Sequence, residues 1–380
     1  MTEGRETSEP KIVVFHDYFA IRGGGERLVL TLANRLGTRL VYGYRTPDSF
    51  EPEMFPTSSH SLGLPNVLRR AGMRPLALAV MFMLAGSREK DRGVRIFSGV
   101  AAPFAVFGCR QNRGANIFYC HTPPRFLYDQ RDYFISRLPG VAKPVAKPLL
   151  WLFERFYRRA VDRMDVIVAN SGNIAGRVRQ YLGKNSIVVP PPVDTDRFLW
   201  RNQGDYYLST ARLSPLKQVD RIIDAFVKMP HKRLVVASGG EELERLRASA
   251  GGAANIELRG WVSDEQLLDL IGNAIATIYL PRDEDFGMSP VESMAAGKPV
   301  IGIAEGGLLE TVIDGETGIL LPKDFSDAQL MSAVEHLTPE TALSMRPACE
   351  ACATRFSRQV FVERMKEVVA GAAQRSGDMA

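Results

Sequence analysis

The chain has 380 residues and a mass of 42.1 kDa, with 45% hydrophobic and 24% charged residues. This length predicts two domains of ordinary size, and the composition excludes wholesale disorder, a coiled coil and a collagen-like fibre. The four cysteines give no disulfide framework, which favours a reducing compartment and a cytoplasmic location. The first ten residues are polar and acidic, so we expect no signal peptide. The longest apolar run, residues 76–86, is too short to span a bilayer.

The net charge of +5 is divided unevenly along the chain. Residues 1–193 hold 28 Lys and Arg against 15 Asp and Glu, a balance of +13. Residues 194–380 hold the remaining 20 against 28, a balance of −8. Such an asymmetry indicates that the first half meets an anionic partner, whether nucleic acid, a membrane or a phosphorylated substrate. The sign of the charge alone does not choose among these three.

Short and nearly all-apolar runs alternate with helix-length segments along the chain. Runs of this kind are typical of strands buried on both faces. They lie at residues 11–15, 116–120, 165–169, 186–189, 206–209, 233–237, 255–258, 276–280 and 300–303. Helical patterns cover residues 218–228, 264–272 and 358–373. The alternation predicts an α/β protein with two doubly wound, Rossmann-like domains.

The domain boundary is expected at three consecutive prolines, residues 190–192, because proline interrupts strands and helices and stiffens a connection. We therefore expect the first domain to cover residues 1–193 and the second to cover residues 194–355. Residues 356–380 should form a C-terminal helix that packs back on the first domain.

The first segment with the chemistry of a binding site runs from Arg22 through three glycines to Glu26 and precedes a helical pattern. Ligands of open α/β sheets bind beyond the carboxyl ends of the strands. Glycines let backbone amides approach an anion at a helix N-terminus. Leu28 replaces the third glycine of the dinucleotide-binding fingerprint. The segment is either a phosphate-binding turn or a tight turn without a ligand.

A second cluster follows the first expected strand of the second half. Arg212 and Lys217 stand five residues apart, and Gln218 opens a helical pattern. A forked guanidinium and a flexible ammonium beside a helix start can clamp a pyrophosphate. Two solvated surface cations would give the same spacing, so the pair alone does not establish a site.

The third cluster, residues 281–300, is more specific. A strand ends there, a loop presents Glu284 and the amides around Phe286 and Gly287, and a helix is expected from about residue 288 to 296. Glu292 lies in this helix among apolar neighbours, and a carboxylate in such a place needs a partner. A sugar or ribose diol would supply paired donors to it, whereas the alternative is a salt bridge.

The order of these motifs resembles glycosyltransferase family 4, the retaining glycosyltransferases with the GT-B fold. In the second half the resemblance rests on two glutamates eight positions apart around Phe-Gly and on residues 292–300 and 305–312. In the first half it rests on residues 16–18, 23–27, 119–129 and 169–171, which look like the bacterial O-antigen and exopolysaccharide mannosyltransferases. The resemblance covers about residues 11–370 and implies two Rossmann-like domains that face each other across a cleft.

The resemblance implies roles for residues of the second half. Arg212 and Lys217 would hold the donor pyrophosphate, Glu284 would contact hydroxyls of the donor sugar, and Glu292 would accept from the ribose hydroxyls. Preformed cations stabilise the negative charge that grows on a departing phosphate. The further donor-binding positions are Val262, beside the base, and Phe286, Gly287, Met288 and Ser289, through backbone amides.

For the first half, the resemblance places the amides of Gly24 and Gly25 at the phosphates and His121 beside the donor sugar. The acceptor side is assigned to His16, Asp17 and Arg125. No metal ligand set is expected and no metal or other cofactor should be required, because basic residues replace the divalent ion. No nucleic-acid-binding module is present, so nucleic acid is not expected as a partner.

The implied function is transfer of a hexose, mannose from GDP-mannose, to a polyprenyl-pyrophosphate-linked oligosaccharide in surface polysaccharide synthesis. The alternatives are another nucleotide-sugar enzyme with the same fold, such as an epimerase, and a nucleotide-sugar-binding partner without catalysis. An epimerase would have no acceptor and would need no basic membrane face. An intact set of Arg212, Lys217, Glu284 and Glu292 argues against the partner without catalysis.

Residues 131–163 indicate where in the cell the basic first half is located. They hold eight Lys and Arg, three acidic residues and several aromatic residues. Basic and aromatic side chains together can hold a protein at an anionic bilayer. We therefore expect a cytoplasmic enzyme at the inner leaflet of the membrane, and the alternative is a core helix with a solvated basic side.

Overall fold

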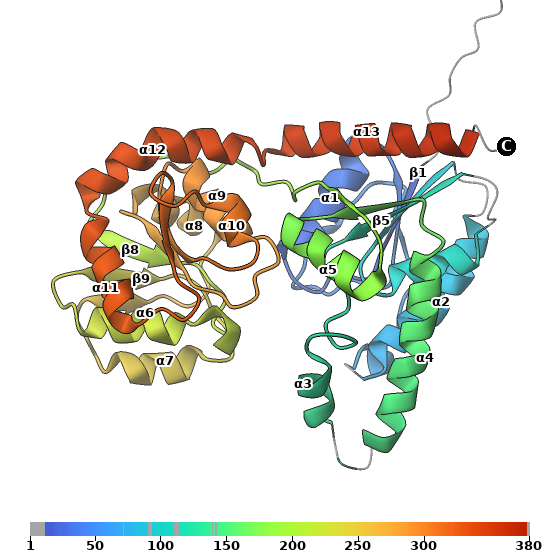
Figure 1. Ribbon diagram of the computed structural model, residues 1–380, viewed down its shortest axis with the longest axis horizontal. Helices are drawn as coiled ribbons and strands as arrows, with labels where there is room; N and C mark the ends of the chain where they lie inside the picture. The colour runs from blue at the N-terminus through green and yellow to red at the C-terminus, as the bar shows by residue number, and fades with distance from the viewer. Residues whose placement is uncertain are drawn as a thin grey trace, which may run out of the picture. The chain divides into compact units, whose positions relative to one another are not determined.

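The computed structural model describes residues 12–70, 72–89, 93–109, 114–138, 140 and 143–377. The chain divides into two compact units after Pro191, within the three consecutive prolines (Figure 1). The second unit is Pro192–Val360, and the chain rejoins the first unit at Phe361. The second unit therefore extends five residues beyond the expected boundary at residue 355.

The described part of the first unit holds a seven-stranded parallel sheet in the order β3-β2-β1-β4-β5-β6-β7. Its strands are β1 (Ile12–His16), β2 (Arg39–Tyr42), β3 (His60–Ser61), β4 (Val94–Ser98), β5 (Ala115–Cys120), β6 (Val166–Ala169) and β7 (Ile187–Val188). Its α-helices are α1 (Gly24–Arg35), α2 (Arg74–Arg88), α3 (Arg131–Ser136), α4 (Lys143–Val161), α5 (Gly172–Leu182) and the greater part of α13 (Arg358–Gly377). Short 3-10 helices are η1 (Pro52–Met54), η2 (Asn66–Arg69) and η3 (Ala102–Phe107).

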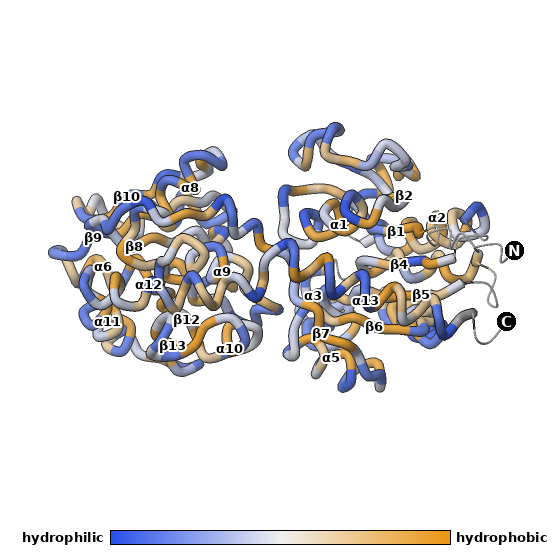
Figure 2. Tube along the Cα trace, turned by 90° about the horizontal axis from the view of Figure 1, so that it is seen from above, coloured by the Kyte–Doolittle hydropathy of each residue, from blue (hydrophilic) through white to orange (hydrophobic). Residues whose placement is uncertain are grey.

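Alternate residues of the strands enter separate cores on the two faces of this sheet. Val14 of β1 and Ile117 of β5 face a core closed by α1 and α13, where Phe361 packs edge-on against Tyr119. Phe15 and Phe118 face the opposite core with α2, η3, α4 and α5. Figure 2 shows the hydrophobic colours along β5 and β6, as burial on both faces requires.

The second unit repeats the arrangement with a six-stranded parallel sheet in its described residues, in the order β10-β9-β8-β11-β12-β13. Its strands are β8 (Tyr206–Ser209), β9 (Arg233–Val236), β10 (Ile256–Leu258), β11 (Thr277–Tyr279), β12 (Val300–Ile303) and β13 (Gly318–Leu321). Its helices are η5 (Pro215–Lys217), α6 (Val219–Val227), α7 (Leu243–Ala250), α8 (Asp264–Asn273), α9 (Met288–Ala295), α10 (Leu308–Thr311), α11 (Asp327–His336) and α12 (Pro339–Thr354).

The predicted α/β class and doubly wound sheets are confirmed, and the named strands lie within a residue or two of their expected positions. Lys11, expected to begin the first strand, lies outside the described residues. Four strands, β2, β3, β4 and β13, were not predicted. In β4 the apolar run is interrupted by Arg95, which is fully buried and donates to Asn116 Oδ1 at 2.8 Å and to the Gly114 carbonyl at 3.0 Å.

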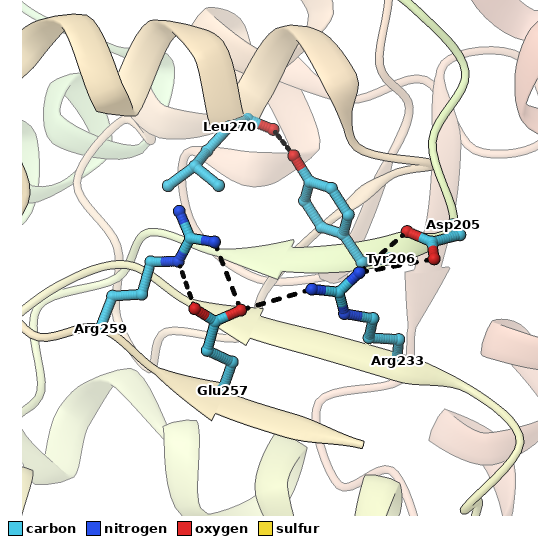
Figure 3. Close-up of polar contacts among 6 residues, drawn as sticks. All are labelled: Asp205, Tyr206, Arg233, Glu257, Arg259 and Leu270. Atoms are coloured by element: carbon cyan, nitrogen blue, oxygen red, sulfur yellow. Dashed lines mark hydrogen bonds and ion pairs between the residues drawn. The ribbon is translucent and has the colours of Figure 1, made fainter. Parts of the chain in front are cut away.

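Charged side chains on β9 and β10 of the second unit form a paired cluster (Figure 3). Arg233 contacts Asp205 at 3.3 Å and Glu257 at 3.5 Å, and Arg259 donates to Glu257 at 2.7 Å. The Tyr206 hydroxyl donates to the Leu270 carbonyl at 2.8 Å. Hydrogen bonds from Arg259 hold the pKa of Glu257 below its ordinary value. These exposed arginines are therefore already neutralised by neighbouring carboxylates, and each such pair adds little stability.

No helix in the described parts of the chain combines the length and the apolar character needed to cross a membrane.

Candidate functional site

In the second unit, the loops after β8 and β11 meet because these two strands are parallel neighbours. Gln218, at the end of the first loop, has a φ of +50° and donates from its side chain to the Leu280 carbonyl at 2.9 Å. The backbone N–H of Arg282 donates to the Leu216 carbonyl at 2.8 Å. These two bonds tie the loop that carries Arg212 to the loop that carries Glu284.

A third loop, after β12, crosses the second one. The Gly307 N–H donates to the Glu284 carbonyl at 2.9 Å, and a methyl group on Gly307 would lie 2.3 Å from the Phe286 Cα. Only glycine allows this approach of two backbones. Gly287 has a φ of +91° and caps α9. The predicted amide positions Phe286, Gly287, Met288 and Ser289 therefore form a fixed turn at the start of a helix.

Three polar side chains are brought together at the end of β11. Lys217 Nζ lies 2.5 Å from Glu284 Oε2 and 2.9 Å from the Tyr279 hydroxyl, and that hydroxyl lies 3.0 Å from Glu284 Oε2. Burial raises the pKa of Tyr279 well above its ordinary value, and the neighbouring Glu284 carboxylate adds to this, so the phenol stays protonated. The sequence analysis missed Tyr279, although a polar tip at the carboxyl end of a buried strand is a recognisable signal.

Arg212 differs from the paired arginines of Figure 3. Its side chain is exposed, and within the described residues its guanidinium makes no hydrogen bond or ion pair. The arginines of Figure 3, by contrast, are paired with carboxylates. Arg212 is therefore a forked donor available to an anionic ligand.

Glu292 is half-buried on α9, as its predicted place among apolar neighbours requires.

The loops after β9 and β10 also meet. A methyl group on Gly239 would lie 2.3 Å from Trp261 Nε1, so the indole lies directly against a glycine backbone. Trp261 is 73% exposed, which is unusual for so large an apolar side chain. Val262 is partly buried beside the core that contains Leu270. The predicted base-binding loop thus presents a flat aromatic surface next to Val262.

In the first unit, the predicted site residues lie at the carboxyl ends of neighbouring strands. His16 ends β1 and pairs in register with Ser98 at the end of β4, and His121 follows β5. His16 Nδ1 lies 3.2 Å from both the carbonyl and the hydroxyl oxygen of Ser98. The same hydroxyl lies 2.7 Å from His121 Nε2. The structure therefore joins the two predicted histidines through Ser98, which the sequence analysis missed because β4 was not predicted.

Asp17, predicted on the acceptor side, is buried and bound to backbone. Its carboxylate accepts from the N–H groups of Val100, Ala101 and Ala102 at 2.7 to 3.1 Å. A methyl group on Gly99, whose φ is +118°, would lie 2.5 Å from the carboxylate carbon. Burial raises the pKa of Asp17 to about 6 against the opposing effect of these hydrogen bonds. In this structure Asp17 holds the loop after β4, and its acceptor role stays a prediction.

The glycine turn leads directly into α1, which begins at Gly24 after Gly23 as its N-cap. A methyl group on Gly25 would lie 3.5 Å from His121 Nδ1 and Cε1. The first turn of α1 and His121 are therefore neighbours, as a shared role at one ligand requires. The phosphate contact predicted for Gly24 and Gly25 stays a prediction.

Arg125 is engaged within its own loop. Its guanidinium donates to Asp129 Oδ2 at 2.8 Å, and Arg177 lies 3.5 Å from the same oxygen. If Arg125 contacts the acceptor, as predicted, its guanidinium is shared between the acceptor and Asp129. Within the described ranges, no three or more His, Cys, Asp and Glu side chains are grouped so that they could hold a metal ion.

Two Rossmann-like units with parallel sheets define the GT-B class of glycosyltransferase fold. Residues 22–197 match the family described as Glycosyltransferase Family 4, and residues 193–351 match Glycosyl transferases group 1. The two matches together cover residues 22–351, and the chain is a glycosyltransferase, so the predicted resemblance to glycosyltransferase family 4, the fold and the enzyme class are confirmed. The bacterial subgroup stays a prediction.

Named relatives give the resemblance more detail. The chain is 26% identical over 388 aligned residues to the alpha-1,3/1,6-mannosyltransferase ALG2 of Dictyostelium discoideum, covering 85% of this chain and 90% of the relative. It is 26% identical over 259 residues to the GDP-Man:Man(3)GlcNAc(2)-PP-Dol alpha-1,2-mannosyltransferase of Homo sapiens, covering 60% of this chain and 52% of that protein.

A solved structure supports the fold alone. Alr3699/HepE from Anabaena, in complex with UDP and glucose, superposes with a TM-score of 0.73 at 15% identity over 95% of this chain and all of that chain.

The two buried histidines should make the protein less stable in acid. Burial lowers the pKa of His16 to about 3, with the neighbouring His121 adding to the effect, and burial lowers the pKa of His121 to about 4. An unfolded chain protonates histidine near pH 6.5, so below that pH the unfolded state binds protons that the folded state does not. Their contribution to stability is therefore complete above pH 6.5 and is lost as the pH falls toward 4.

Urea unfolding at pH 7 and pH 5 measures this effect. His121→Gln removes one of the two titrations, so the loss of unfolding free energy between these pH values should shrink by about 2 kcal/mol. His60→Gln, at an exposed position, is the matched control and should leave the loss as in the wild type. Equal losses in the wild type and His121→Gln would contradict the burial argument.

Proposed function

We propose that this glycosyltransferase moves mannose from GDP-mannose to a lipid-linked oligosaccharide, with retention of the anomeric configuration. The observation that carries the proposal is the arrangement of Arg212, Lys217, Glu284 and Glu292 around the ends of β8 and β11. Two cations suit a pyrophosphate, and two carboxylates suit hydroxyl pairs of a ribose and a hexose. The donor and acceptor classes are supported by the similarity to the human mannosyltransferase, whose name includes both GDP-Man and a PP-Dol-linked glycan.

The proposed mechanism assigns the main electrostatic role to the second unit. As the bond between the sugar and the pyrophosphate breaks, negative charge grows on the phosphate oxygens. Arg212 and Lys217 stabilise this charge, with help from backbone N–H groups at the start of α9. The departing phosphate takes the acceptor proton on the same face of the sugar, which gives retention without a protein nucleophile. No metal or other cofactor is required, because the two cations supply the charge.

The proposed role of Arg212 can be tested by substitution. If Arg212 stabilises charge in the transition state, Arg212→Ala should lower kcat/KM roughly 100-fold or more, as the loss of one preorganised donor does. Arg221→Ala is the matched control. Arg221 donates to the Phe325 carbonyl at 2.8 Å and pairs with Asp327 at 3.2 Å, so its loss should leave turnover near the wild-type value. A folded Arg212→Ala protein with wild-type turnover would overturn the assignment.

The reaction can be tested with a panel of labelled nucleotide sugars and a membrane lipid extract. We expect label to pass from GDP-mannose to a lipid fraction, the NMR spectrum of the product to show an alpha linkage, and EDTA to leave the rate unchanged. Transfer from a UDP-sugar would reassign the base, and a beta linkage would overturn retention. Loss of activity with EDTA would overturn only the metal-free claim. Turnover of the sugar without an acceptor would favour the epimerase alternative.

We further propose that the first unit holds the enzyme at the inner leaflet of a membrane through the outer faces of α2 and α4. Both helices pack on η3 with their buried sides. Their exposed sides are apolar to an unusual degree, with Val80 59%, Leu84 65% and Trp151 56% exposed. The other exposed apolar residues of these helices are Leu76, Met83, Val145, Leu149, Leu152 and Phe156. A contiguous apolar helix face of this kind is typical of a contact surface.

Basic side chains accompany the apolar residues of α4. Arg155 lies over the Trp151 ring at 5.6 Å and Arg159 over the Phe156 ring at 5.8 Å. Within the described part of the chain, neither arginine forms an ion pair. Each basic residue near an anionic bilayer contributes about 1 kcal/mol of binding. Within this basic and aromatic segment, α4 is an amphipathic helix whose exposed side carries apolar as well as basic residues, and this supports the membrane proposal over a core helix with a solvated basic side.

Flotation with anionic liposomes tests this surface. Replacing Arg155, Arg158 and Arg159 with Ser should weaken binding, and raising the salt concentration should weaken wild-type binding, because exposed charges are screened over about 10 Å at 0.1 M salt. Replacing Arg245, Arg247 and Arg259 with Ser is the matched control. These arginines are already paired with Glu242, Glu244 and Glu257 on the second unit. Absence of wild-type binding even at low salt would contradict the membrane proposal.

A further inference from the structure

We infer that Ser98 is a positioning residue that fixes His121 in one neutral tautomer, with the proton on Nδ1 and a lone pair on Nε2. His121 would then present an N–H donor, and not a base, beside Gly25 at the first turn of α1. The tautomer follows from the geometry of the first unit alone. Its meaning for sugar transfer rests on the proposed function.

The first step of the argument concerns His16. Its Nδ1 lies 3.2 Å from the Ser98 carbonyl oxygen, and a carbonyl oxygen can only accept a hydrogen bond. His16 therefore carries a proton on Nδ1. Because the Ser98 hydroxyl oxygen is at the same distance of 3.2 Å, this N–H points at both oxygens of Ser98.

The second step concerns the single hydroxyl proton of Ser98. The N–H of His16 approaches the hydroxyl oxygen, which therefore acts as the acceptor on that side. The remaining close partner of the hydroxyl is His121 Nε2 at 2.7 Å, a typical length for a strong hydrogen bond. The hydroxyl donates its proton in this bond, so Nε2 of His121 carries a lone pair.

The third step concerns the protonation state of the pair. Both rings are buried, and burial lowers the pKa of His16 to about 3 and that of His121 to about 4. Two imidazolium ions with ring centroids 6.4 Å apart would also repel each other. Both rings are therefore neutral near pH 7, and a neutral His121 with a lone pair on Nε2 has its proton on Nδ1.

The fourth step places this proton near the first turn of α1. A methyl group on Gly25 would lie 3.5 Å from His121 Nδ1 and Cε1 and 3.9 Å from Nε2, so Gly25 packs on the face of the ring, close to Nδ1. Within the proposed function, an N–H there suits an oxygen acceptor, either a sugar hydroxyl or a phosphate oxygen. It also excludes His121 as the base through Nδ1, which agrees with a phosphate taking the acceptor proton.

NMR with ¹⁵N-labelled histidine tests the tautomer on the whole protein without any substrate. The chain has only five histidines, and the variants His16→Asn and His121→Gln assign the two signals of interest. We expect His121 to show a protonated Nδ1 and a bare Nε2 in the wild type. Ser98→Ala removes the donor to Nε2, so the second tautomer should appear. A protonated Nε2 in the wild type, or an unchanged tautomer in Ser98→Ala, would overturn the inference.

Kinetics test the consequence for transfer. Ser98→Ala should lower kcat about tenfold, the equivalent of one lost hydrogen bond, while the KM for the nucleotide sugar changes little. Ser98→Thr keeps the hydroxyl and should restore both the tautomer and kcat. If the tautomer is as expected but Ser98→Ala keeps wild-type kcat, the positioning role is wrong. If the tautomer is as expected but no nucleotide sugar is turned over, the proposed function fails and the tautomer stands.

Discussion

Burial of each parallel sheet on both faces is the constraint on which the rest of this structure depends. Because strand residues on either face lie in a dry core, polar side chains of the site are favoured at the positions where strands end. The same selection operates in both units. His16, Ser98 and His121 stand at or just beyond the ends of β1, β4 and β5, while Tyr279 ends β11 in the second unit. The site residues are therefore a consequence of the fold and not an addition to it.

The apolar runs predicted the strands well because period and composition are local properties of the sequence. The prediction failed where tertiary structure overrides composition. Arg95 would be costly in a buried strand if its charge had no partner, but Asn116 and the Gly114 carbonyl accept from it. A single-sequence pattern contains no information about such a distant partner, and the loss of β4 from the prediction also hid Ser98.

The candidate site was predicted to a similar extent and for similar reasons. Spacing around Glu284 and Gly287 was sufficient to locate the loop after β11, because a helix start leaves a recognisable pattern. It could not show that Gln218 and Gly307 tie three loops together, since those bonds join residues up to 62 positions apart. Nor could it distinguish Arg212 from the paired arginines of Figure 3, because pairing depends on three-dimensional neighbours.

The two units differ in the kind of polarity that they place at their strand ends. The second unit holds full charges, with Lys217 bound to Glu284 and Arg212 exposed. A pyrophosphate needs such charges because its own charge grows as it departs. The strand-end histidines of the first unit are neutral, since burial keeps both His16 and His121 uncharged near pH 7. Neutral donors and acceptors match hydroxyl groups without the desolvation cost that a buried charge would carry. These neutral histidines contribute nothing to the surplus of positive charge in the first unit. The basic side chains of α4 lie on the surface of that unit, where they can act on an anionic partner at longer range.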